Sequence, residues 1–253
     1  MHLINRPSGR FHNRLWIEDD EFDVVALRTL DANQLFPETP SPVNIELLVE
    51  RLFPCAYEFS HLDKKLMGRI AFGPHGPISI EIDHRLDRPD NELINRRCRS
   101  TLGHECGHGV LHSCLFKQLW REGPRPERGI ILCDNGRNLD DSVTPNEERW
   151  FEYQANRMMA SLLLPLPLVI ACIGDQYLEP DRYLRLSPGD RMSLAGDLQD
   201  AFDVSRTLAN YRLQDIFGKV FPRLISIRDR GTPPTYETLN LCWPNQIFGQ
   251  SAA

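Results

Sequence analysis

The sequence contains no apolar run long enough to cross a bilayer. Its most apolar stretch, residues 160–173, is shorter than the roughly 20 residues of a membrane-spanning helix, and Pro165 and Pro167 interrupt it. We expect a buried helix followed by an extended segment there. The first 25 residues also lack the continuous apolar core of a secretory signal. Both absences predict a cytoplasmic protein that does not associate with membranes.

Paired cysteines are absent as well. The seven cysteines are an odd number, and no two of them have C-x-x-C spacing. A disulfide framework or a cysteine-ligated structural zinc site would show paired spacing. We therefore expect reduced thiols.

The chain also lacks an excess of positive charge. Its formal net charge is −6, with a pI near 5.8, so no general attraction to nucleic acid or to anionic lipid is expected. With 253 residues, 41% of them hydrophobic, it can bury a core as one large domain or as one domain with an appendage.

Hydrophobic periodicity predicts a mixture of helices and strands. Helices are expected at residues 19–33, 43–53, 90–112 and 145–164, and two short helices are expected around residues 203–205 within 190–217. Short strands are expected at residues 55–59, 66–72 and 77–82, and the tail from Pro222 is a candidate for more. Asp90 is a candidate N-cap, and Pro165 should end the helix before it.

Two segments are expected to lie outside this framework. Residues 1–18 show no periodicity and resemble a frayed terminus. Residues 113–146 contain glycine, proline and charge, which predicts a long surface excursion beside the helix at 90–112. Such a segment is either a functional loop or an insertion.

The motif that carries chemistry is H-E-x-x-H at residues 104–108. On a helix, residues four apart lie about 40° apart around the axis and about 6 Å along it, so His104 and His108 can both reach one tetrahedral ion. Zinc is favoured for imidazole and carboxylate ligands, with water at the fourth position, and manganese is an alternative. Glu105 can take a proton from that water and pass it to a leaving amine.

The glycines around the motif support a functional interpretation over two solvated histidines that bind nothing. Gly103, Gly107 and Gly109 each cost a helix about 1 kcal/mol relative to alanine. Close packing beneath a metal site would require small residues at these positions.

A third ligand should come from another element, and Glu152 is the preferred candidate. It lies on the helix predicted at 145–164, and Asn156 on the same face could orient a ligand histidine or the Glu152 carboxylate. Glu147, Glu148 and Asp141 remain alternatives.

Three neighbouring residues are not expected to bind the metal. His112 is separated from His104 by about 12 Å of helical rise, so we interpret it as a supporting or capping residue. Cys106 projects from the wrong helix face, and Cys114 is expected, like Cys106, to be a small buried hydrophobe. Tyr153, His75 and nearby arginines are possible oxyanion partners, and none of them is preferred.

Residues 99–112, followed by residues 152–165, resemble the ImmA/IrrE family of metallo-endopeptidases. Residues 76–80 before the motif and 194–213 after it are also similar to that family, so the resemblance covers roughly residues 43–217. The chain departs from the family pattern in the long 113–146 segment and at Met158 and Met159.

This resemblance implies an α+β fold and a specific activity. His104, His108 and Glu152 map onto the family's zinc ligands and Glu105 onto its catalytic glutamate, in a gluzincin-like site. A zincin-like domain with a small antiparallel sheet packed on the motif helix would be followed by a helical, helix-turn-helix-like subdomain. The expected parts are an N-terminal extension (1–42), the peptidase domain (43–175), the helical subdomain (185–220) and a C-terminal tail (221–253). The implied substrate is a helix-turn-helix repressor encoded nearby, whose cleavage would relieve repression of mobile-element or stress-response genes.

Two other functions remain open from the sequence. The chain could be a metal-binding regulatory or toxin–antitoxin partner that binds a regulator without turnover. Residues 190–217 could instead read DNA, but residues 190–219 carry five aspartates against three arginines and one lysine, a poor match to phosphates. We favour a packing or substrate-docking role for them.

Overall fold

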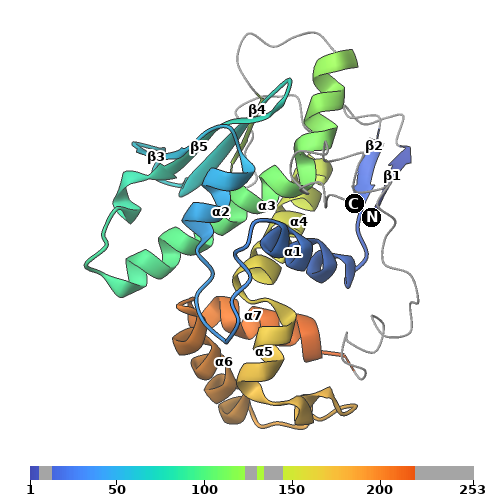
Figure 1. Ribbon diagram of the computed structural model, residues 1–253, viewed down its shortest axis with the longest axis vertical. Coiled ribbons are helices and arrows are strands. Elements are labelled where there is room, and N and C mark those ends of the chain that lie inside the picture. The colour runs from blue at the N-terminus through green and yellow to red at the C-terminus, as the bar shows by residue number, and fades with distance from the viewer. Residues whose placement is uncertain (6–12, 123–129, 134–144, 220–253) are drawn as a thin grey trace.

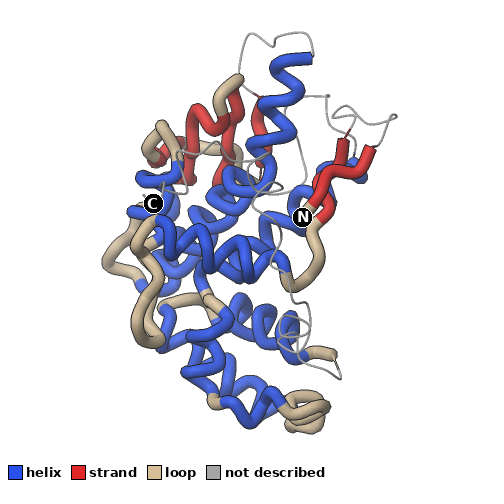
Figure 2. The backbone as a smooth tube through the Cα atoms, turned by 45° about the vertical axis from the view of Figure 1, so that its right-hand side comes forward, coloured by secondary structure: helices blue, strands red, loops and turns tan. Residues whose placement is uncertain are grey.

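The computed structural model describes residues 1–5, 13–122, 130–133 and 145–219. It combines helices with two small sheets, so the expected α+β class is confirmed at that level. A long helix, α3 (Glu92–Glu122), runs through the middle of the molecule. The larger sheet lies on one side of its upper part and the N-terminal strands on the other, with α5, α6 and α7 gathered at the opposite end (Figures 1 and 2).

The larger sheet has the strand order β3-β5-β4-β6, and β4 and β5 pack against α3. Its strands are β3 (Tyr57–Ser60), β4 (Gly68–Gly73), β5 (Gly76–Asp83) and β6 (Ile130–Cys133). The β4–β5 pair is antiparallel as expected, and the unpredicted strand β6 also pairs antiparallel with β4, but β3 and β5 are parallel. The chain passes from β3 to β4, which is not its neighbour in the sheet. Strand β5 then lies between them and runs parallel to β3. The expected purely antiparallel sheet is therefore wrong.

Helix α3 extends ten residues beyond the predicted end at residue 112. Its added turns bury Leu115 and Phe116, and the Phe116 ring stacks on Phe72 of β4 with centroids 4.2 Å apart. The first part of the expected surface excursion is thus core helix, and β6 adds an edge strand from the same segment. The N-cap is Asn91 rather than Asp90, because the Asn91 side chain accepts a hydrogen bond from the Ile94 amide at 3.1 Å.

The expected frayed N-terminus is also wrong. Strand β1 (His2–Asn5) pairs antiparallel with β2 (Asn13–Trp16). Leu15 and Ile17 are buried, and the Trp16 ring stacks on Trp150 at 5.6 Å. Two four-residue strands are too short to show a periodic pattern, so their order depends on contacts with distant parts of the chain.

The other helices in the first two thirds of the chain follow the predicted limits closely. They are α1 (Glu21–Ala32), α2 (Ile45–Leu52) and α4 (Pro145–Leu163). The segment after Pro165 is a short helix, α5 (Leu166–Ile173), rather than the extended segment expected. Pro167 falls in its first turn, where the missing N–H costs no helical hydrogen bond. Among the described helices none alone has the length and apolarity to span a membrane, although α4 from Arg149 and α5 together, bent by 55°, meet those criteria.

The two helices expected around residues 203–205 are confirmed as α6 (Pro188–Phe202) and α7 (Arg206–Phe217). Asp203 between them adopts a left-handed conformation, and the Ser205 hydroxyl caps α7 by accepting from the Leu208 amide at 3.1 Å. The Asp203 carboxylate accepts from Arg96 of α3 at 2.8 Å, so this turn is tied to the central helix. The strands suggested for the tail from Pro222 lie outside the described residues.

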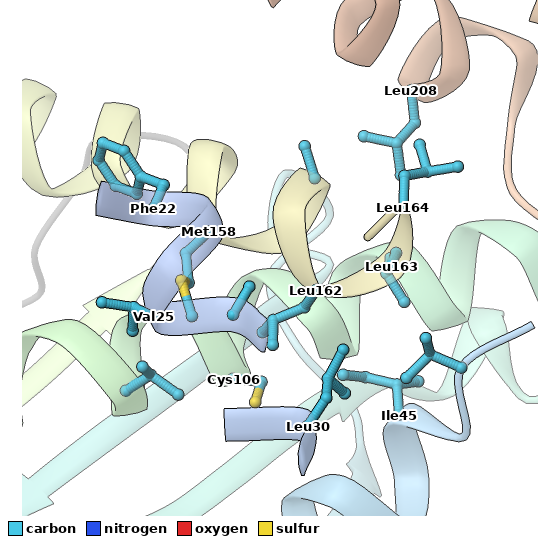
Figure 3. Close-up of a cluster of buried hydrophobic side chains, with 14 of the residues drawn as sticks. Phe22, Val25, Leu30, Ile45, Cys106, Met158, Leu162, Leu163, Leu164 and Leu208 are labelled. Atoms are coloured by element: carbon cyan, nitrogen blue, oxygen red, sulfur yellow. The ribbon is translucent and has the colours of Figure 1, made fainter. Parts of the chain in front are cut away.

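The buried apolar side chains form one cluster that joins α1, α2, α3, α4 and α7 (Figure 3). Cys106 is fully buried within it, as expected of a small hydrophobe. A Cβ at Gly107 would lie 2.9 Å from the Ala155 carbonyl oxygen of α4, and one at Gly109 would collide with the Phe53 ring. The glycines of the motif therefore permit close helix packing, as their positions predict.

Candidate metal centre

The packing of α3 against α4 brings His104, His108 and Glu152 together. The Nε2 atoms of the two histidines are 3.0 Å apart. The Glu152 carboxylate lies across from both, with Oε2 at 3.2 Å from His104 Nε2 and Oε1 at 3.3 Å from His108 Nε2. The three residues predicted as ligands thus form one group.

Their spacing is compatible with one shared metal ion. With metal–ligand bonds of about 2.1 Å, two ligand atoms of a tetrahedral ion lie about 3.4 Å apart. The observed separations of 3.0–3.3 Å are close to this value. Both histidines are buried and Glu152 retains partial access, with 17% of its side chain exposed. The group could hold a metal ion; Asp141 and the side chains of Glu147 and Glu148 lie outside what the structure describes.

The charge state of Glu152 suits a ligand. Burial by itself raises the pKa of this carboxyl, but the nearby His108 and the hydrogen bonds with His104 and His108 outweigh that effect and lower the pKa well below its usual range. Glu152 therefore faces the two imidazoles as a carboxylate over the whole physiological pH range.

Each of the two histidines has a hydrogen-bond partner on the ring nitrogen that faces away from the group. His104 Nδ1 lies 3.1 Å from Asn156 Oδ1, a contact that suits one of the two roles expected for Asn156, that of orienting a candidate ligand histidine. His108 Nδ1 lies 3.1 Å from His112 Nδ1. His112 is therefore a supporting residue, whereas a capping role finds no place in the middle of α3.

Gln154 was not among the residues predicted for the site, yet its Oε1 lies 3.1 Å from His112 Nε2. Burial, together with the nearby His108, lowers the pKa of His112 well below its ordinary value, so His112 is neutral near pH 7. The only feature of the sequence that could have indicated Gln154 is that it is a polar residue two positions from the candidate ligand Glu152.

Glu105 is fully buried, and its carboxylate faces the first residue of β4. A Cβ at Gly68 would lie 2.6 Å from Glu105 Oε1 and 2.7 Å from Thr101 Cγ2. The absence of a side chain at Gly68 therefore leaves the space that the Glu105 carboxylate occupies.

The remaining candidates lie outside the ligand group. Tyr153 is 40% exposed and its ring stacks on Trp150, while His75 is exposed in the turn between β4 and β5. Cys114 is half-buried, and its thiol contacts the Leu111 carbonyl at 3.7 Å. No described contact connects Tyr153 or His75 to His104, His108 or Glu152.

No protein-family model matches this chain, and a search of curated proteins returned no match.

Proposed function

We propose that this protein is a cytoplasmic zinc-dependent endopeptidase with a zincin-like fold. The observation that carries the proposal is the convergence of His104 and His108 with Glu152, and Glu105 directly follows His104 in the H-E-x-x-H motif. The sheet that packs on the helix bearing this motif supports the same proposal. Manganese is the alternative metal, since imidazole and carboxylate ligands also suit it.

The chemistry assigned to the chain follows from these positions. His104, His108 and Glu152 would hold the zinc ion, which would lower the pKa of a bound water toward about 7. Glu105 accepts a proton from the attacking water on its carboxylate and delivers it to the nitrogen of the leaving amine. Asn156 holds the His104 ring in the orientation that ligation requires.

The proposed substrate is a helix-turn-helix repressor encoded by a neighbouring gene. The support is the resemblance of residues 99–112 and 152–165 to metallo-endopeptidases that cleave such regulators. Asp203, between α6 and α7, accepts a hydrogen bond from Arg96 of α3. This contact supports a packing or docking role for α6 and α7 over direct DNA binding.

The experiment that tests this function measures metal and cleavage together. Metal content per chain would be determined by mass spectrometry of the purified protein, and the neighbouring helix-turn-helix protein would be incubated with it and analysed for fragments. One zinc per chain and a defined cut support the peptidase. Zinc without cleavage would favour the regulatory partner that binds without turnover, and absence of metal would contradict the site.

Replacement of the third ligand should weaken metal binding. We expect Glu152→Ala to reduce zinc affinity by roughly 10-fold or more, because losing a ligand should cost at least as much as losing a residue that orients one. Competition with a chromophoric chelator measures the affinity. Glu147→Ala and Glu148→Ala are the matched controls on α4. Wild-type affinity in Glu152→Ala, with loss in either control, would place the third ligand elsewhere.

Gly68→Ala should impair the general base Glu105 without weakening metal binding. The three atoms nearest the added methyl group belong to Glu105 and Thr101, so we expect it to displace the Glu105 carboxylate. Cleavage should fall by about 10- to 100-fold while zinc affinity stays near the wild-type value. Steady-state cleavage and chelator competition measure the two effects. The control is Gly189→Ala, where a methyl group meets nothing closer than Ser187 Oγ at 3.7 Å. Unchanged cleavage in Gly68→Ala would contradict the assigned position of the base.

A further inference from the structure

A continuous chain of hydrogen bonds connects the N-terminal strand β2 with the metal ligand His108. Gln154 Nε2 donates to the Leu15 carbonyl at 3.0 Å. Gln154 Oε1 lies 3.1 Å from His112 Nε2, and His112 Nδ1 lies 3.1 Å from His108 Nδ1. Gln154, His112 and His108 are all fully buried, so solvent does not replace these partners.

The Leu15 carbonyl, at one end of this series of hydrogen bonds, determines which group donates and which accepts in each of them. The Leu15 carbonyl can only accept, and it already receives the Trp150 indole N–H at 3.0 Å, so Gln154 must turn its amide nitrogen toward Leu15. Its oxygen then faces His112, and because that oxygen can only accept, His112 must carry its proton on Nε2.

The protonation of His112 in turn determines which ring nitrogen of His108 carries a proton. The Nδ1 atoms of His112 and His108 share one hydrogen bond, so only one of them carries a proton. With the His112 proton on Nε2, His112 accepts at Nδ1 and His108 donates from its own Nδ1. The lone pair of His108 is thereby left on Nε2, the atom that faces His104 and Glu152. The opposite tautomer would place a proton on Nε2, where a metal ion would have to bind.

We propose that Gln154 is a positioning residue of the metal site. It acts through His112 to hold His108 in the tautomer that binds metal, and it takes its own orientation from the Leu15 carbonyl of β2. The inference rests on the proposed metal site and adds the N-terminal sheet to it. Helix α4 thus supplies one ligand, Glu152, and two residues that orient the histidines of α3.

The first test compares zinc affinities. Gln154→Leu keeps the approximate volume but removes both the donor and the acceptor, and it should bind zinc about 10- to 100-fold more weakly than the wild type. Gln199→Leu on α6 makes the same chemical change away from the site and should bind zinc like the wild type. His112→Phe should lose affinity to a similar extent, and His112→Asn should recover most of it, because its side-chain oxygen can accept from His108 Nδ1.

The second test reads the tautomers directly. Long-range proton–nitrogen NMR of the ¹⁵N-labelled, zinc-loaded wild type should show His112 protonated at Nε2 and His108 at Nδ1. A proton on His112 Nδ1 would overturn the inference. This test uses the wild type, so it does not depend on whether Gln154→Leu folds. Circular dichroism of each zinc-free variant checks the folding of the variants.

The outcomes distinguish this inference from the proposed function. Tight zinc binding by the wild type with equal binding by a folded Gln154→Leu would overturn the role of Gln154 and leave the metal site intact. A wild type that takes up no zinc would contradict the metal site itself and, with it, the positioning role.

Discussion

Glu105→Gln is expected to bind zinc like the wild type and to cleave about 100- to 10,000-fold more slowly. The amide has nearly the shape of the carboxylate and should fit the same buried space beside Gly68. It cannot accept the proton of the attacking water, however, so the chemical step loses its base. The proposed ligands His104, His108 and Glu152 are unchanged, and metal content should therefore stay near one ion per chain.

The measurement is cleavage of the helix-turn-helix protein under single-turnover conditions, with zinc content determined on the same samples. Glu92→Gln is the matched control, because this residue lies on the same helix but 86% of its side chain is exposed. It should cleave at the wild-type rate. Normal cleavage by Glu105→Gln would rule out the assigned base, and loss of zinc would show that the residue acts mainly on the metal ligands.

Arg212→Met is expected to lower the free energy of unfolding by about 3–5 kcal/mol. Arg212 is fully buried in α7 and forms ion pairs with Asp23 of α1 and Asp215, the latter at 3.1 Å. It also donates to the Leu164 carbonyl at 3.0 Å, just after α4. Methionine fills much of the volume but leaves two buried carboxyl groups without this partner. Urea denaturation in the presence of a chelator would measure the change without a contribution from metal.

The loss of stability should depend on pH. Burial raises the pKa of Asp215 to about 6, although the neighbouring Arg212 and Arg157 act in the opposite direction. Removing Arg212 should raise this pKa further. A carboxyl whose folded pKa lies above its unfolded value favours folding at low pH, and this contribution is lost as the pH rises through the folded pKa. The difference between wild type and Arg212→Met should therefore be larger at pH 8 than at pH 5.

Arg185→Met is the matched control for this effect. Arg185 pairs with Asp181 at 3.6 Å, but 74% of its side chain is exposed, so its loss should change stability by no more than about 0.5 kcal/mol. A similarly small effect of Arg212→Met, or an effect of equal size at pH 5 and pH 8, would contradict the structural role assigned to the buried cluster.

The helices with long amphipathic patterns could be predicted from the sequence, whereas short elements could not. Helices α1, α2 and α4 and the pair α6 and α7 follow the predicted limits because each buries a regular apolar face. Strands β1 and β2 have four residues each, and α5 begins beside two prolines. Their conformations depend on what they pack against, as the contact of Trp16 with Trp150 illustrates.

The candidate site divides in the same way. Local helical geometry is enough to place His104 and His108 on one helix face, with Glu105 next to His104, since it relates residues four apart without any other part of the chain. The addition of Glu152 to the group depends on long-range packing, because α4 must approach α3 across Gly107 for its carboxylate to reach both histidines. The tautomer of His108 depends on a contact between parts of the sequence that are even further apart, because the Leu15 backbone carbonyl orients Gln154. No local pattern encodes a hydrogen bond between residues 139 positions apart.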